Sequence, residues 1–303
     1  MTYHEALKNA EQRLRDAGVP DSDNDAELLL EKASGKERAR ILLEWNDEIS
    51  DEEANRFEAY ILRRINREPL QYIYGTWEFM GLDFICDPAC LIPRQDTELL
   101  VMLALDEIRG MTENRTGNVS ADKCPDSYNS GKIRLLDLCT GSGCVVISMV
   151  KLAENGRVEA VGADISEAAL DVAVRNAELN GVRIDFRQSD MFGNIPEKEF
   201  DIVTANPPYI ETEVIKGLNP EINRYEPMIA LDGGEDGLKH YRSIISGAKE
   251  HLKNGGKIMM EIGDTQGLSV AGLLESAGYS DVEVRKDLAG LDRVVCASWY
   301  NDL

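Results

Sequence analysis

The sequence predicts an α/β protein in which a mostly parallel, seven-stranded sheet with an antiparallel edge hairpin follows a small helical bundle and a β-hairpin. Three observations predict this fold. Residues 1–70 show only helical periodicity, residues 71–95 alternate aromatic and aliphatic side chains around two glycines, and short apolar strands alternate with helical stretches from Ile133 onward. Strands that alternate with helices are typical of parallel sheets covered on both faces.

Composition narrows the class of protein. The 303 residues include 43% hydrophobic and 29% charged side chains, and the formal net charge is −22. Long contacts with nucleic acid usually need a basic surface, so this acidity argues against them. The sequence shows no membrane span and no secretory core, and its six cysteines include no CxxC pair. We therefore expect a cytoplasmic protein with free thiols, no metal site and no membrane contact.

The first region, residues 1–70, is expected to form the helical bundle. One helix should begin at a capping Ser22 and end near Gly35. Another should open with Ser50 and Glu53, which have capping-box spacing. The apolar residues of this second helix form one stripe: Ala54, Phe57, Ile61 and Ile65. Packing explains most of this pattern, although a small bundle beside a larger domain could also dock a partner.

Residues 71–95 are interpreted as a β-hairpin linker to a third region, residues 96–303. Residues 96–109 return to helical periodicity. The polar stretch 110–132 is rich in Asn, Ser and Gly and is predicted to be an exposed, mobile loop. The basic cluster "RRINRE" at 63–68 is interpreted as a solvated helix face, with contact to an acidic partner surface as the alternative.

Six apolar segments are the predicted strands of the third region: "IRLLDLCTGSG", "VEAVGADIS", "RIDFRQSDMF", "FDIVTANPPY", "GGKIMMEIG" and "RVVCASWY". Helical stretches such as "EAALDVAVRNAELNG" separate most of them. The segments "DVEVRKD" and "DRVVCASWY" have only a short connection that contains Gly290. This connection predicts an antiparallel hairpin at the edge of the sheet.

The ends of the first three strands carry groups suited to a nucleotide-like cofactor. Asp137 lies near the end of the first strand, and Gly141 and Gly143 then let the backbone approach a ligand at a helix N-terminus. Asp164 ends the second strand, where a carboxylate can accept hydrogen bonds from both ribose hydroxyls. The third strand ends with residues that could sandwich an adenine: Asp190, Met191 and Phe192. The turn 139–143 lacks GxGxxG spacing, which favours S-adenosylmethionine over a dinucleotide.

The fourth strand ends in "NPPY" beside the same crevice. The prolines remove two N–H donors and stiffen the turn. The side-chain oxygen of Asn206 and the carbonyl of Pro207 could then accept both hydrogens of a planar –NH2 group, with Tyr209 stacked on its plane. Such nitrogens are poor nucleophiles, and two acceptors would orient the nitrogen and stabilise its developing positive charge. The turn therefore predicts methylation of an amide or aromatic amine.

Six segments, in order, resemble the HemK/PrmC family, the glutamine methyltransferases of peptide chain release factors. They read "EPLQYIYGTWEFMGLDF", "LIPRQDTE", "LDLCTGSG", "NPPYI", "YEPMIALDGGEDGL" and "EIGDTQ", and they cover roughly residues 60–300. The tetrapeptide "NPPY" alone would not separate this family from DNA and RNA amino-methyltransferases. The segments "LIPRQDTE" and "EPLQYIYG" do most to separate them.

The resemblance implies a Rossmann-like class I S-adenosylmethionine-dependent methyltransferase domain at 96–303 and a substrate-recognition domain at 1–70. It implies S-adenosylhomocysteine as product and the glutamine of the Gly-Gly-Gln motif of a release factor as acceptor. In this family pattern Asp164 would bind ribose and Met191 would flank adenine. The methionine part of the cofactor would be lined by Cys139, Thr140, Gly141, Ser142 and Gly143. The residues expected to hold the glutamine are Asn206, Pro207, Pro208 and Tyr209, and Asn206 is expected to border the cofactor too.

Three positions depart from the family pattern, because the family often has Gly at Cys139, Pro at Gln95 and an aromatic residue at Met191. None of these departures removes a group that the chemistry requires. Arg94 could contact the cofactor or brace the site. The alternatives are an adenine or cytosine amino-methyltransferase of nucleic acids, which the acidic charge opposes, and a non-catalytic scaffold subunit, which the intact site residues oppose. A monomer is expected.

Overall fold

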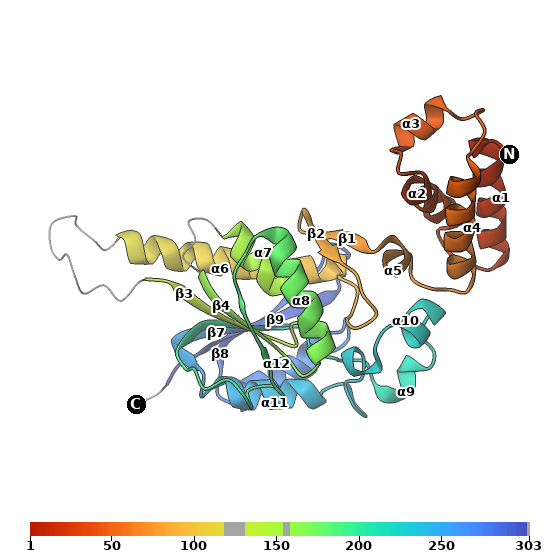
Figure 1. The fold of residues 1–303 in the computed structure, drawn as a ribbon. Helices are drawn as coiled ribbons and strands as arrows, with labels where there is room; N and C mark the ends of the chain where they lie inside the picture. Colours follow the sequence, from red (N-terminus) through yellow and green to blue (C-terminus); the bar gives the residue numbers. More distant parts are fainter. Residues whose placement is uncertain (118–130, 154–157, 302–303) are drawn as a thin grey trace. The chain divides into compact units, whose positions relative to one another are not determined.

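The structure is a computed structural model, and it describes residues 1–117, 131–153 and 158–301 (Figure 1). The chain divides into two compact units. The N-terminal unit comprises Met1–Trp77, Cys86–Pro88 and Leu218–Glu226, and the sheet unit comprises Glu78–Ile85, Ala89–Gly217 and Pro227–Leu303. The N-terminal unit therefore includes a short segment from the second half of the chain.

The N-terminal unit is a bundle of helices around its own apolar core. Its helices are α1 (Tyr3–Asp16), α2 (Ser22–Ser34), α3 (Arg38–Leu43), α4 (Asp51–Ile65), α5 (Leu70–Tyr74) and, from the inserted segment, α10 (Pro220–Tyr225). The predicted capping box at Ser50 and Glu53 is confirmed, and α1 begins with a second capping box at Thr2. The apolar stripe of α4 faces the core, where Phe57 and Ile61 are buried.

The prediction of Ser22 as the cap of α2 is wrong. The N-cap residue is Asp21, and Ser22 is the first helical residue. The hydroxyl of Ser22 donates to the Asp23 carboxylate (3.3 Å). The predicted end of this helix is confirmed, because Gly35 takes the left-handed conformation (φ 68°) that glycine adopts without steric cost.

The basic cluster at 63–68 binds its own chain, so its interpretation as a solvated face is wrong. Arg64 is only 5% exposed; it donates to Asp25 Oδ2 (2.7 Å) and to Glu221 Oε1 (3.0 Å). Arg67 forms a bidentate pair with the same Glu221. Burial raises the pKa of Asp25, against the lowering effect of Arg64. A buried arginine therefore holds two carboxylates inside the N-terminal unit.

The sheet unit contains the predicted α/β fold. Its seven-stranded sheet has the order β5-β4-β3-β6-β7-β9-β8. The strands are β3 (Ile133–Leu138), β4 (Val158–Asp164), β5 (Asp185–Gln188), β6 (Phe200–Ala205), β7 (Leu252–Glu261), β8 (Ser280–Lys286) and β9 (Asp292–Trp299). The pairs from β5 to β7 are parallel, and β9 pairs antiparallel with both β7 and β8. The mostly parallel sheet with an antiparallel edge hairpin is thus confirmed.

Helices cover both faces of this sheet, as Figure 1 shows. Helices α6 (Glu98–Gly117), α7 (Cys144–Leu152) and α8 (Glu167–Asn180) share one apolar cluster with one face, and α11 (Lys239–Ala248) and α12 (Gly267–Ser276) share another with the opposite face. Consecutive residues of β3 point to opposite clusters, Leu135 to the first and Leu136 to the second. Burial on both faces explains the continuous apolar runs of these strands.

A separate two-stranded sheet is formed by β1 (Thr76–Phe79) and β2 (Leu82–Ile85). The two residues between these strands, Met80 and Gly81, both have positive φ (54° and 72°), the backbone that a tight hairpin turn requires. The expected β-hairpin is therefore present, but the predicted start of that region at residue 71 is wrong, because Leu70–Tyr74 form α5. No helix in the described ranges is both long and apolar enough to cross a membrane.

The prediction of a loop from residue 110 is wrong at its start. Helix α6 continues to Gly117, because Met111 packs against the apolar cluster and the Thr112 hydroxyl donates to the Ile108 carbonyl (2.8 Å). Packing thus outweighs the helix-breaking tendency of Gly110. The rest of that predicted loop, at 118–130, lies outside the described residues.

The buried Arg64 generates a stability prediction. Arg64→Ala should lower the free energy of unfolding of the N-terminal unit by about 3 kcal/mol, because Asp25 would keep its buried charge without a partner. Arg63→Ala is the matched control: Arg63 is half-exposed and pairs with Glu68, so its loss should cost less than about 1 kcal/mol. Urea denaturation followed by tryptophan fluorescence measures both variants. An equal decrease in the free energy of unfolding for the two variants would contradict the conclusion that the buried Arg64 ion pair stabilises this unit.

Candidate active site

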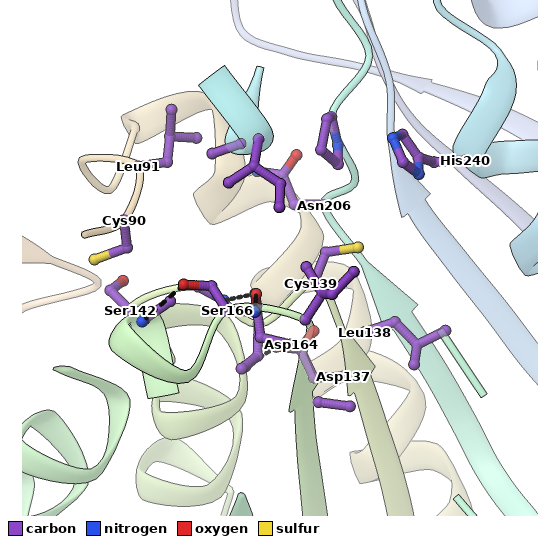
Figure 2. Close-up of a pocket in the computed structure, with 18 of the residues that line it drawn as sticks. Cys90, Leu91, Asp137, Leu138, Cys139, Ser142, Asp164, Ser166, Asn206 and His240 are labelled. Atoms are coloured by element: carbon purple, nitrogen blue, oxygen red, sulfur yellow. Dashed lines mark hydrogen bonds between the residues drawn. The ribbon is translucent and has the colours of Figure 1, made fainter. Parts of the chain in front are cut away.

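A cavity of about 650 Å³ opens at the carboxyl ends of the parallel strands (Figure 2). Four strand ends contribute to its lining: Cys139 after β3, Asp164 at the end of β4, Asp190 after β5 and Asn206 after β6. The chain order of the sheet reverses between β3 and β6. Open α/β sheets bind their ligands at this type of switch point, and the volume is in the usual range for a small-molecule site.

Most residues that the sequence predicts for the site come together here. The lining includes eleven of them: Arg94, Asp137, Cys139, Thr140, Gly141, Ser142, Asp164, Asp190, Met191, Asn206 and Pro208. Four other described residues of the prediction, Gly143, Phe192, Pro207 and Tyr209, are not part of the lining. Gly143 is the N-cap of α7, where a Cβ would lie 2.8 Å from Ile147 Cδ1. That glycine is required for packing of the turn against the helix.

Asp137 joins the two halves of the site. Its side chain is 1% exposed, and its two carboxylate oxygens accept hydrogen bonds from Thr140 Oγ1 (2.6 Å) and Thr204 Oγ1 (2.7 Å). Burial raises the pKa of Asp137 to about 7, although both hydroxyls lower it. Thr140 lies in the turn after β3, and Thr204 lies in β6, two residues before Asn206. The Asp137 carboxyl group therefore links the turn after β3 to the end of β6.

Asp164 closes the turn after β3 from the neighbouring strand. Its Oδ2 accepts from the backbone N–H of Gly141 (2.8 Å), and its Oδ1 accepts from that of Ser166 (2.9 Å). Asp164 and Ser166 are labelled in Figure 2. Burial raises the pKa of Asp164. A carboxylate has about four acceptor positions, so each oxygen can accept one more hydrogen bond.

Two residues in the lining have unusual backbones. Cys139 (φ 54°), which follows β3, and Met191 (φ 49°), which lies after β5, take the left-handed conformation. Non-glycine residues rarely adopt it, and such strain gathers at ligand sites. Phe192, which the sequence placed beside an adenine, instead stacks on His251 with ring centroids 4.5 Å apart. Met191 and Asp190 are thus the members of that expected trio that line the cavity.

The charges around the cavity suit a cationic ligand. Its ionisable lining contains the carboxyl groups of Asp137, Asp164, Asp190 and Asp232, against the cations of Arg94 and Lys239. His240 also belongs to this lining, and burial raises the pKa of Asp137 to about 7. The described residues contain no group of three or more His, Cys, Asp or Glu side chains arranged to hold a metal ion.

The acceptor turn presents two oxygen atoms. Asn206 donates from Nδ2 to Thr97 Oγ1 (3.4 Å), which directs its Oδ1 away from that contact. Within the described chain, neither this Oδ1 nor the carbonyl oxygen of the buried Pro207 accepts a hydrogen bond. A buried carbonyl without a partner is rare in folded proteins. Within the described residues, both oxygens are therefore without a hydrogen-bond donor from the protein.

Loops that the sequence did not assign to the site hold this turn. Gln266 donates from Nε2 to the Tyr209 carbonyl (3.0 Å), and its Oε1 accepts from the N–H of Gly263 (2.9 Å). A Cβ on Gly233 would lie 2.8 Å from Tyr209 Cα, so only glycine fits there. The Tyr209 hydroxyl donates to Glu261 Oε1 (3.4 Å). Glu261 ends β7, so the strand-end rule that indicated Asp164 could also have indicated Glu261.

The fold and this strand-end cavity define a class I S-adenosylmethionine-dependent methyltransferase. The PrmC N-terminal domain family matches residues 5–75, and the methyltransferase small domain family matches residues 126–219. A release factor glutamine methyltransferase of Cereibacter sphaeroides is 39% identical over 98% of both chains. Another, from Geobacter sulfurreducens, is 37% identical over 93% of this chain and 91% of the relative.

The chain therefore belongs to the release factor glutamine methyltransferase family. Among solved structures, the hMettl16 catalytic domain in complex with MAT2A 3'UTR hairpin 6 has a TM-score of 0.52 and 16% identity, with 84% of each chain covered. A likeness at this identity concerns the fold alone.

The link through Asp137 generates a prediction about the cofactor. Asp137→Ala should weaken binding of S-adenosylmethionine at least tenfold, or about 1.4 kcal/mol, because the Thr140 turn would lose its anchor. Thr204→Val keeps the volume and removes only one hydroxyl, so its effect should be smaller. Isothermal titration calorimetry measures both affinities. Unchanged affinity in Asp137→Ala would contradict the role given to this carboxyl group.

Proposed function

We propose that this protein transfers a methyl group from S-adenosylmethionine to the side-chain amide nitrogen of the glutamine in the Gly-Gly-Gln motif of peptide chain release factors, and thereby modulates translation termination. The observation that carries the proposal is the acceptor turn 206–209, which offers two oxygens beside a cavity with an acidic lining. Its relatives are named for this glutamine methylation.

S-adenosylmethionine, when bound, supplies an electrophilic methyl group, and S-adenosylhomocysteine is the product. The turn 139–143 would hold the methionine part, since its backbone is already fixed by Asp137 and Asp164. The Asp164 carboxylate would accept from the ribose hydroxyls, and Met191 would flank the adenine. These roles use the acceptors and the apolar surface that the cavity already presents.

The chain's own part in the reaction is to orient a weak nucleophile. The glutamine side chain would donate one N–H to Asn206 Oδ1 and the other to the Pro207 carbonyl, with Tyr209 as the flat wall beside the amide plane. Two fixed acceptors direct the nitrogen lone pair toward the methyl group and stabilise the positive charge that grows on nitrogen. The nitrogen would form its new bond to the methyl carbon as the bond from that carbon to sulfur breaks, and it would then release one proton to water, so the product is a neutral secondary amide.

The same two acceptors would select glutamine over glutamate. A glutamate carboxylate has no N–H to donate, so it would leave both oxygens unpaired and face them with like charge. Sites that hydrogen-bond a substrate group reject analogues without it by roughly 10⁴-fold. The net charge of −22 disfavours the alternative of a nucleic-acid base as substrate, since phosphates would be repelled.

We also propose how the chain divides this work. Residues 1–70 would recognise the release factor, residues 71–95 would link the two parts, and residues 96–303 would carry out methyl transfer. The substrate is a component of translation, so we expect the enzyme to act in the cytoplasm, as a monomer and without a metal ion.

The experiment that tests this function removes the acceptor side chain. Asn206→Ala should reduce methylation of release factor on the order of 100- to 1,000-fold, because one of the two fixed acceptors is lost in the transition state. Binding of S-adenosylmethionine should change less than about threefold. Incorporation of labelled methyl groups and calorimetry measure the two effects.

The control for this experiment is Asn254→Ala, which removes an asparagine from β7 near the end of the strand opposite the cavity. This variant should behave as wild type in both assays. Near-normal turnover in Asn206→Ala would overturn the assignment, and so would methylation of bare nucleic acid with no activity on release factor.

A further inference from the structure

Two exposed apolar side chains belong to the wall of the cavity. Met228 is 55% exposed and Ile229 is 54% exposed, and both line it. A side chain that lines a cavity and is also more than half exposed lies at its mouth, so these two residues form an apolar rim. Other large apolar residues of the described chain are as exposed but lie outside the lining: Met1, Leu42, Leu43, Leu179, Leu268 and Leu288.

The segment that carries this rim is bonded to the acceptor turn through the backbone. The N–H of Ile210, the residue after the turn, donates to the Leu231 carbonyl (3.0 Å). The Gly233 N–H donates back to the Ile210 carbonyl (2.8 Å). A Cβ on Gly233 would lie 2.8 Å from Tyr209 Cα, so the two backbones are in direct contact. The rim is therefore held at a fixed position beside the turn 206–209.

The rim lies on the acceptor side of the cavity, away from the residues assigned to the cofactor. Asp164 ends β4 and Met191 follows β5, and both strands lie on the opposite side of β3 from β6. The rim segment instead forms a β-bridge, Ile210 with Asp232, next to the turn after β6. Asn206 begins that turn. A glutamine that enters the cavity to reach Asn206 would therefore bring its neighbouring backbone against the rim.

We propose that Met228 and Ile229 are specificity-determining residues for the protein substrate: they form the apolar surface against which the glycine before the glutamine lies. Glycine has no side chain, so its backbone can approach this surface closely. Burial of the two exposed side chains by the substrate would favour binding in proportion to the apolar area removed from water. This inference rests on the proposed function, because it deepens the recognition of the same glutamine.

Removal of the rim tests its part in substrate binding. The double variant Met228→Ala/Ile229→Ala should raise the KM for release factor on the order of 10-fold, because apolar contact area is lost. Its kcat should stay within about threefold of wild type, since Asn206 and Pro207 still orient the amide. Incorporation of labelled methyl groups at varied release factor concentration and saturating cofactor measures both constants. Calorimetry should show an unchanged Kd for S-adenosylmethionine.

Two single variants are the matched controls. Leu179→Ala removes a leucine that is 52% exposed in α8 and lies outside the lining, and it should behave as wild type in both assays. Ile165→Ala removes a side chain that is 47% exposed and lines the same cavity beside Asp164. This variant should weaken binding of S-adenosylmethionine and leave the KM for release factor unchanged. An equal rise in that KM for either control would contradict the assignment to the rim.

A change in the substrate tests the contact itself. Release factor in which alanine replaces the glycine before the glutamine adds one methyl group where the rim should lie. Wild-type enzyme should use this substrate with kcat/KM lowered on the order of 10-fold, because the added methyl group meets the rim. The double variant should discriminate between the two release factors by less than about threefold, since its shorter side chains leave room.

The outcomes distinguish this inference from the proposed function. Suppose that wild-type enzyme methylates the glutamine. An unchanged KM in the double variant, or equal discrimination between the two release factors by wild type and double variant, would then overturn the rim and leave the function standing. A weakened Kd for S-adenosylmethionine with an unchanged KM would assign the rim to the cofactor and also overturn it. Wild-type enzyme without activity on release factor would overturn both.

Discussion

The site depends on one buried carboxyl group between two strands. The Asp137 carboxyl group accepts hydrogen bonds from Thr140, in the turn after β3, and from Thr204, in the strand before the turn 206–209. One side chain therefore fixes the positions of these two turns relative to each other. Parallel strands alone would bring their ends to a common edge but would not fix the turns that follow them. A methyl transfer over a few ångströms needs such a fixed relation, because small misplacements cost large factors in rate.

Residues near the ends of the neighbouring strands hold the same two turns in place. Asp164 holds the turn after β3 through the Gly141 N–H, while Gln266 and Gly233 hold the turn after β6 at Tyr209. Glu261 accepts a hydrogen bond from the Tyr209 hydroxyl at the end of the same turn. Methylation of an amide by this chain therefore requires no lysine, histidine or cysteine nucleophile. The protein supplies fixed acceptors, and the substrate supplies the nitrogen.

The sequence predicted the parts of this arrangement that follow from periodicity and strand ends. The sequence could place the sheet, its edge hairpin and the crevice residues Asp164 and Asn206. An apolar run that stops at a polar residue indicates where a strand ends, and the ends of parallel strands meet at one edge of the sheet. Partners far apart along the chain could not be placed in this way. The salt bridge of Arg64 with Glu221 spans 157 positions, and the Thr97 contact with Asn206 spans 109. Helix α6 extends beyond its predicted end at residue 109, because packing of Met111 against the apolar cluster outweighs the low helix propensity of Gly110.

The central claim is that this enzyme methylates an amide nitrogen held by the turn 206–209. Fragmentation mass spectrometry of release factor, after incubation with the enzyme and labelled S-adenosylmethionine, tests it most directly. The account predicts a single added methyl group on the side-chain nitrogen of the glutamine in the Gly-Gly-Gln motif, and none when that glutamine is replaced by glutamate. A methyl group on a lysine, a carboxylate or a nucleic-acid base instead would contradict it.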